Sequence, residues 1–262
     1  DSKKMLQKER RGTLFVDTQR KLNFYLRALW GRDFFLRPAA ADREGFKPYY
    51  EDHVMHLPDA VDAIGPVTGL ELYRAQSAHL AAHLCYTTAA IPGAGLSPAQ
   101  KFLVGLVEDA RVEYRAAQAF PGLRKLWGRL LAIDHDGQVE HPTVPLLERF
   151  ALCLNDDMVC IDDAELQRIA ASFHAGVEAR QQDNGFSLEL GLALFEVLAN
   201  RKDLPSLRIL ESIRVPYRDD NRIVWAYEPF EWDERGAGFV PTWQRQVRKY
   251  VSAVEMANEV DC

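Results

Sequence analysis

The sequence lacks the short motifs that identify nucleotide-binding and hydrolytic enzymes. It contains no G-x-x-x-x-G-K-[ST] phosphate loop, no dinucleotide-binding G-x-G-x-x-G and no G-x-S-x-G nucleophile elbow. An H-E-x-x-H peptidase motif is also missing, because no acid follows the first histidine of His79-Leu80-Ala81-Ala82-His83. We therefore expect no catalytic residues and no cofactor in this chain, and any ATP hydrolysis linked to it has to come from a partner protein.

Basic charge and long apolar runs are scarce as well. The 262 residues carry a formal net charge of −6, whereas nucleic-acid-binding proteins usually show a basic excess. No apolar run approaches the roughly 20 residues of a membrane-spanning helix. The charged N-terminal stretch DSKKMLQKERRG does not resemble a signal peptide. These features predict no nucleic-acid partner and no membrane partner.

Cysteine is rare and shows no metal-binding or redox spacing. The four cysteines form no C-x-x-C pair, and they are Cys85, Cys153, Cys160 and Cys262. Unpaired cysteines in apolar helical surroundings are typical of reduced, buried thiols. We expect a cytoplasmic protein without a cysteine zinc site.

Amphipathic helical patterns cover most of the chain and predict a mainly α fold. Two helical runs between residues 70 and 120 are separated by Ile91-Pro92-Gly93-Ala94-Gly95, and Ser97-Pro98 restarts the second run. The short linker predicts a central helical hairpin. Residues 31–69 are expected to wrap around it with little regular structure, and residues 222–227 form one small β element. We expect a single helical region over 1–262, with a division into 1–134 and 143–262 as the alternative.

Polar residues of the hairpin allow two interpretations. His79 and His83 are one helical turn apart, and Asp109 and Glu113 repeat this spacing on the second helix. These four side chains could hold a metal ion. In the alternative interpretation, Asp109, Arg111 and Glu113 form a buried structural cluster with Arg74, the histidines and backbone groups of residues 31–69.

Aromatic residues near the C-terminus allow two interpretations as well. Phe230, Trp232 and Trp243 surround an acidic loop, Glu231 and Asp233 included. Aromatic side chains often anchor protein partners, so these three are candidate partner-binding residues. A packed corner between a strand, a loop and a helix is the alternative.

Three sequence blocks together resemble the CbbO/NorD-type adaptor proteins. The first block contains His56-Leu57-Pro58-Asp59, Leu72-Tyr73-Arg74-Ala75 and the run from Ala78 to His83. The second is Glu108-Asp109-Ala110-Arg111-Val112-Glu113. The third contains Tyr227 and Phe230-Glu231-Trp232-Asp233, with Trp243 ten residues further on. The blocks span residues 53–250, and the second also looks like a run in cobalt-chelatase subunits.

The resemblance implies an adaptor that works with a hexameric MoxR-type AAA+ ATPase. In that family a helical region precedes a von Willebrand factor A domain, whose D-x-S-x-S motif binds a metal ion. That motif is absent here, so the resemblance implies the N-terminal portion without this domain. One branch of the family activates Rubisco by releasing inhibitory sugar phosphates, and another matures nitric oxide reductase. We expect Rubisco as the target protein, with nitric oxide reductase as the alternative.

Overall fold

The helical periodicity of the sequence corresponds to eight α-helices in the described part of the chain. The computed structural model describes residues 12–39, 46–133 and 141–226. The helices are α2 (Phe15–Trp30), α3 (Gly69–Tyr86), α4 (Pro98–Ala119), α5 (Pro121–Leu131), α6 (Thr143–Asn155), α7 (Ala164–Gly176), α8 (Gly185–Asn200) and α9 (Leu207–Glu211). The predicted mainly helical fold with a small β component is confirmed.

Local capping residues explain where the central helices begin. The Ser97 side chain accepts a hydrogen bond from the Gln100 backbone N–H, and the Gln100 side chain accepts one from the Ser97 N–H. Pro98 occupies the first helical position of α4, as predicted. Thr68 and Glu71 form the same reciprocal capping box at α3. These caps satisfy backbone donors that have no partner within the helix.

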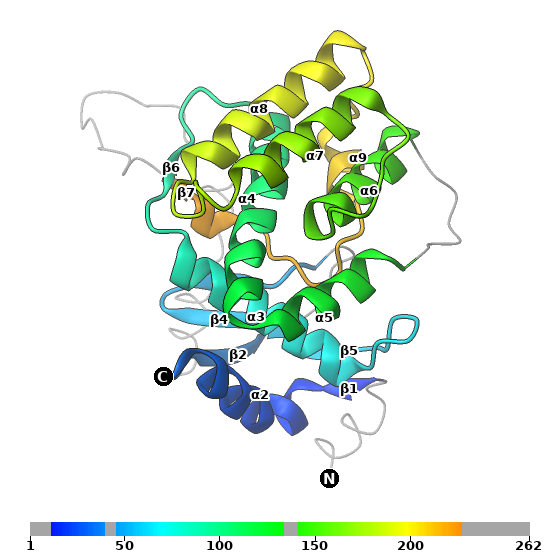
Figure 1. Cartoon of the computed structure of the whole chain (residues 1–262). Helices are drawn as coiled ribbons and strands as arrows, with labels where there is room; N and C mark the ends of the chain where they lie inside the picture. Colours follow the sequence, from blue (N-terminus) through cyan, green and yellow to red (C-terminus); the bar gives the residue numbers. More distant parts are fainter. Residues whose placement is uncertain (1–11, 40–45, 134–140, 227–262) are drawn as a thin grey trace, which may run out of the picture. The chain divides into compact units, whose positions relative to one another are not determined.

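Helix α4 is the centre of the fold, and α3 packs against it as the predicted hairpin. Helix α4 also contacts α5, α6, α8 and α9 (Figure 1). The contact with α8 is close because Gly191 has no side chain, and a Cβ atom there would lie 2.4 Å from the Cα of Val104. Helix α4 is therefore covered on several sides, and polar residues on it have to find partners inside the protein.

The segment before the hairpin is more regular than predicted. It contains the strands β2 (Phe35–Ala39), β3 (Tyr49–Glu51), β4 (Val54–Pro58) and β5 (Ala60–Val61), and β5 pairs with β1 (Thr13–Leu14). Strand β4 pairs with β2 in parallel and with β3 antiparallel. Its residues Met55 and Leu57 are buried, and Val54 and His56 between them are half-buried. This alternation is confined to five residues and stops at a proline, so it is too short to stand out as a strand pattern in the sequence.

The predicted β element at 222–227 is only partly a strand. Arg222–Val224 form a 3₁₀ turn, and the strand β7 (Trp225–Ala226) follows it. Strand β7 pairs in parallel with β6 (Ile91–Pro92) in the hairpin linker. The residues before the turn are held by Gln76 Nε2, which donates to the Pro216 carbonyl at 3.2 Å, and by the Asp220 N–H, which donates to the Pro48 carbonyl at 3.1 Å. The chain after α9 therefore returns to the hairpin.

All described residues belong to one compact unit, and α5 and α6 contact each other on either side of residues 134–140. The predicted division into two subdomains at this point stays a prediction. Cys85, Cys153 and Cys160 are free thiols, as expected, but Cys160 is exposed and Cys85 half-buried, contrary to the prediction of burial. Across the described helices, none combines the length and hydrophobicity needed to span a bilayer.

Candidate functional site

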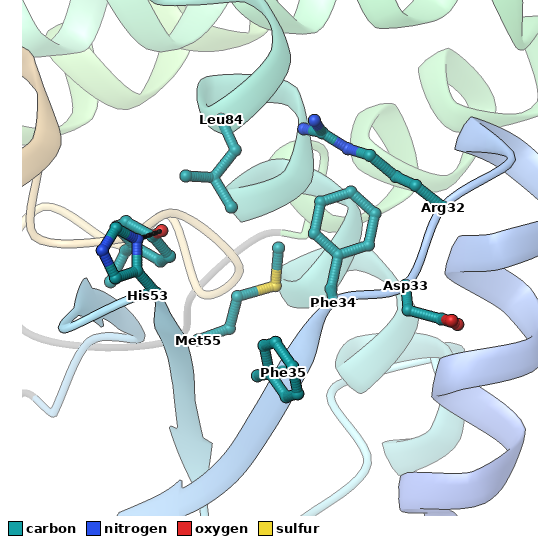
Figure 2. A pocket seen from close by; sticks show the side chains of 8 residues that line it. Arg32, Asp33, Phe34, Phe35, His53, Met55 and Leu84 are labelled. Atoms are coloured by element: carbon teal, nitrogen blue, oxygen red, sulfur yellow. Dashed lines mark hydrogen bonds between the residues drawn. The ribbon is translucent and has the colours of Figure 1, made fainter.

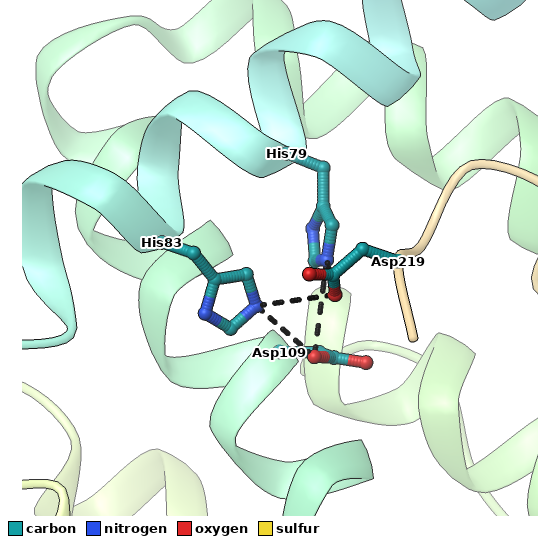
Figure 3. A group of neighbouring side chains, drawn as sticks. All are labelled: His79, His83, Asp109 and Asp219. Carbon is teal, nitrogen blue, oxygen red and sulfur yellow. Dashed lines mark hydrogen bonds and ion pairs between the residues drawn. The ribbon is translucent and has the colours of Figure 1, made fainter. Parts of the chain in front are cut away.

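Two histidines and two aspartates meet inside the fold (Figure 3). His79 and His83 lie on one face of α3, Asp109 comes from α4, and Asp219 comes from the irregular segment after α9. All four residues are at most 2% exposed. Three parts of the chain far apart in sequence therefore contribute to one buried polar group, which we call the His–Asp cluster.

The ring nitrogens and carboxylate oxygens of the His–Asp cluster face one another at short range. His79 Nε2 lies 3.4 Å from Asp219 Oδ1 and 3.8 Å from Asp109 Oδ1. His83 Nε2 lies 3.2 Å from Asp109 Oδ1 and 3.8 Å from Asp219 Oδ1. One ligand atom from each of the four residues lies within 4.8 Å of the others. Nε2 of each histidine therefore has two carboxylate oxygens within 3.8 Å.

An arginine–glutamate pair borders the His–Asp cluster on the side of His79. Arg218 donates from Nε and Nη2 to the two carboxylate oxygens of Glu113, at 2.8 and 2.9 Å. The same guanidinium donates to the Leu106 carbonyl at 3.2 Å and lies 3.5 Å from Asp109. His79 Nδ1 lies 3.1 Å from Glu113, although the two atoms are not aligned for a hydrogen bond. Glu113 is thus occupied mainly by Arg218.

A second network borders the cluster on the side of His83. The Thr87 hydroxyl donates to Glu108 at 3.0 Å, and it lies 3.0 Å from His83 Nδ1. Glu108 also accepts hydrogen bonds from Arg111, at 2.8 and 2.6 Å, and from the Ser187 hydroxyl of α8 at 2.7 Å. The single hydroxyl hydrogen of Thr87 points to Glu108, so its oxygen has to accept the hydrogen of His83 Nδ1. His83 Nε2 then faces Asp109 Oδ1 at 3.2 Å, where it carries either a hydrogen that the carboxylate accepts or a lone pair that a metal ion would bind.

The electrostatics of the cluster follow from burial and close charges. Burial lowers the pKa of His79, but contacts with Asp219 and Glu113 and the charge of Asp109 outweigh it and raise the pKa to about 9. Burial raises the pKa of Asp109, yet the nearby Arg218 and the histidines bring it down to about 2. Arg218 similarly keeps the pKa of Glu113 below its usual value despite burial. Both acids are therefore ionised at neutral pH.

Within the described residues, several atoms of the His–Asp cluster lack a hydrogen-bond partner. Both carboxylate oxygens of Asp219 and both ring nitrogens of His79 are buried without one. Buried polar atoms are hydrogen-bonded in the large majority of cases, and exceptions often mark a missing water or ion. A cavity of about 20 Å³ reaches Asp109 and Asp219 from the side of Lys47 and Phe102. This volume is enough for one water molecule.

The predicted metal ligands come together only in part. His79, His83 and Asp109 do converge, whereas Glu113 is bonded to Arg218 and Asp219 lies in its place. No sequence pattern points to Asp219, because it lies outside any helix and is 110 residues from Asp109. Its neighbour Arg218 was missed for the same reason.

The predicted polar cluster of Arg74, Asp109, Arg111 and Glu113 is divided between the two networks. Asp109 and Glu113 contact histidines as predicted, but Arg111 belongs to the network of Glu108. The prediction that Arg74 pairs with Asp109 and Glu113 is wrong. In the described structure the Arg74 guanidinium lies over the ring of Tyr25 on α2, 5.5 Å from its centroid, and Arg218 pairs with the acids instead.

A second feature of the described surface is a pocket of about 270 Å³ near the start of β2 (Figure 2). Its lining includes Arg32, Phe34, Phe35, His53 and Met55. Phe35 is 73% exposed, and it lies on β2, which is an edge strand of its sheet.

The candidate partner-binding residues Phe230, Trp232 and Trp243 lie outside the described residues.

Comparisons of the chain with protein-family models, with curated proteins and with solved structures found no match.

Proposed function

We propose that this chain is the non-catalytic helical part of an adaptor that couples a hexameric MoxR-type AAA+ ATPase to a target protein in the cytoplasm. Rubisco is the first candidate target, and release of inhibitory sugar phosphates is the proposed outcome. The proposal rests on the resemblance of the three sequence blocks to CbbO/NorD-type adaptors. A binding role also agrees with the absence of nucleotide-binding motifs from the sequence.

The positions of two blocks in the fold support this proposal. Residues 78–83 lie on α3 and residues 108–113 on α4, where their polar side chains hold the centre of the fold together. Such a role requires no catalysis by these residues. In the described structure the cavity at the His–Asp cluster has room for no more than one water molecule. This cavity is too small for a sugar phosphate.

An adaptor also needs a surface for its ATPase. Val16, Phe24 and Phe35 are apolar and between 56% and 73% exposed, on α2 and the neighbouring edge strand β2. Exposed aromatic residues are frequent anchors at protein interfaces. We place the first test of ATPase docking at Phe35.

The test is reconstitution with purified components. The chain, within its full-length adaptor, is mixed with the ATPase hexamer and followed by size-exclusion chromatography and by reactivation of sugar-phosphate-inhibited Rubisco. We expect co-elution and ATP-dependent reactivation, with at least ~10-fold weaker binding for Phe35→Asp. Met158→Asp is the control, since Met158 is 84% exposed on the α6–α7 connection.

Two results would contradict the proposal. Hydrolysis of ATP by the purified chain alone would contradict a non-catalytic role. Failure of the full-length adaptor to bind any MoxR-type ATPase would contradict the adaptor function. Activation of nitric oxide reductase instead of Rubisco would keep the adaptor function and change its target.

A further inference from the structure

We propose that the His–Asp cluster is a buried binding site for one divalent transition-metal ion, with His79, His83, Asp109 and Asp219 as its ligands. The ion connects α3, α4 and the segment after α9. The ligand atoms are Nε2 of both histidines and Oδ1 of both aspartates (Figure 3).

The distances between these atoms suit a tetrahedral site. Zn–N and Zn–O bonds of 2.0–2.2 Å place neighbouring ligands of a regular tetrahedron about 3.3–3.6 Å apart. The four histidine-to-aspartate distances range from 3.2 to 3.8 Å, and the histidine–histidine and aspartate–aspartate pairs lie within 4.8 Å. Four of the six ligand pairs are therefore within about 0.2 Å of the tetrahedral spacing, and the other two pairs set how far the site has to contract around an ion.

The outer nitrogen of each histidine faces an oxygen outside the cluster, and at His83 this contact is a hydrogen bond. Glu108 accepts a hydrogen bond from the Thr87 hydroxyl, and the Thr87 oxygen in turn accepts one from His83 Nδ1. On the other histidine, Nδ1 lies 3.1 Å from the Glu113 carboxylate. Carboxylates that engage the outer nitrogen of a histidine ligand are typical of metal sites, because they set the tautomer and raise the basicity of the inner nitrogen.

The balance of buried charge leaves room for a cation when both histidines are neutral, the form in which they bind metal. Four described carboxylates are buried, and they belong to Glu108, Asp109, Glu113 and Asp219. Only two arginines are buried with them, Arg111 paired with Glu108 and Arg218 paired mainly with Glu113. With neutral histidines, two negative charges remain on Asp109 and Asp219. One divalent ion neutralises both, and it supplies the partner that the orphaned Asp219 oxygens lack.

The donor set indicates the class of metal. Two imidazole nitrogens disfavour Mg²⁺ and Ca²⁺, which prefer oxygen ligands only. Two nitrogens and two oxygens in a tetrahedral arrangement suit Zn²⁺ and other first-row divalent ions. The adjacent cavity of about 20 Å³ has room for a water molecule as a fifth ligand.

Protonation of both histidines is the competing explanation, since two imidazolium groups also neutralise the two aspartates. The explanations differ in a measurable way. A protonated cluster is complete without metal, so added Zn²⁺ has no effect on it. A metal site gains stability from Zn²⁺ in proportion to occupancy.

The experiment uses the full chain without a histidine tag, purified without chelators. We expect close to one metal ion per chain by mass spectrometry of the metals. After removal of the metal, a Zn²⁺ concentration 100-fold above Kd should raise Tm by roughly 5–10 °C. Substitution with Co²⁺ should give the strong visible absorption of a four-coordinate ion.

Asp219→Asn tests the ligand assignment, with Asp220→Asn as the matched control because Asp220 is an exposed neighbour. Competition with a coloured chelator should show at least ~100-fold weaker Zn²⁺ binding for the first variant, and an unchanged Kd for the second. Equal binding by Asp219→Asn and the unaltered chain would overturn the assignment. If that variant does not fold, the metal content and the Zn²⁺-dependent Tm of the unaltered chain test the site. An absence of bound metal together with an unchanged Tm in Zn²⁺ overturns the site.

Discussion

The buried pair of Arg218 and Glu113 allows a direct test of what holds the C-terminal part of the described chain to the hairpin. Both side chains are 3% exposed, and two hydrogen bonds join them. Glu113→Gln keeps the size of the side chain but removes its charge and turns one acceptor into a donor. Arg218 then keeps one neutral acceptor, the amide oxygen, together with the Leu106 carbonyl and with Asp109, which lies 3.5 Å away.

The expected loss follows from the cost of an uncompensated buried charge. Removal of one partner of a buried ion pair typically costs 3–5 kcal/mol, and the amide that replaces the carboxylate keeps one acceptor. We therefore expect a loss of about 3 kcal/mol in the free energy of unfolding. For a domain of this size that corresponds to a fall in Tm of roughly 6–12 °C.

The assay is urea unfolding followed by circular dichroism, with and without Zn²⁺. Glu189→Gln is the control, because Glu189 forms an exposed pair with Arg180 and should lose less than about 1 kcal/mol. In the double variant Glu113→Gln/Arg218→Met the orphaned guanidinium is gone, so it should be more stable than Glu113→Gln alone. A loss below about 1 kcal/mol for Glu113→Gln, or a double variant no better than the single one, would refute this reasoning.

Three further predictions concern acid stability, helix packing and metal removal. Hydrogen bonds from the Thr68 backbone and from Arg129 lower the pKa of Glu71 to about 2, so its contribution to stability is present above pH 4.5 and is lost as pH falls toward 2. Glu71→Gln should therefore flatten the acid-unfolding curve in this range. Gly191→Ala should cost about 1–3 kcal/mol by chemical denaturation, because its Cβ would overlap α4, whereas Gly122→Ala has open space and should be neutral or stabilising. Dialysis against a chelator should lower the Tm of chain purified with bound metal, and one equivalent of Zn²⁺ should restore it; a Tm insensitive to both steps would contradict the proposed metal site.

Most of the helical framework was predictable because its signals are local. Ser97 and Pro98 mark the start of α4, and Gly31 ends α2 in the left-handed conformation at φ 68°. The burial of α3 on more than one side was also evident, since only Glu71 and Arg74 are charged within residues 70–82. Periodicity and capping are properties of neighbouring residues, so they need no knowledge of tertiary contacts.

The environment of α4 was less predictable because it depends on distant residues. Glu108 and Arg111 lie off the apolar stripe of the helix, a position typical of a solvent-exposed face, yet both are 0% exposed. Helix α8 covers them, and Ser187 reaches Glu108 from it. Asp219 escaped prediction for a related reason, since its partners lie on helices more than 100 residues earlier. Three of the four candidate ligands were visible in the hairpin, and Asp219 required the fold.

The long sequence separation between α4 and Arg218 has a consequence for synthesis of the protein. Glu113 precedes Arg218 by 105 residues, and ribosomes add about 5–20 residues per second. The hairpin therefore exists for roughly 5–20 s before its arginine partner can emerge. During that time closure of the hairpin would bury Asp109 and Glu113 with the histidines of α3 but without the arginine that holds Glu113 in the complete fold. Final packing of these two helices is thus delayed until nearly the whole described chain has left the ribosome.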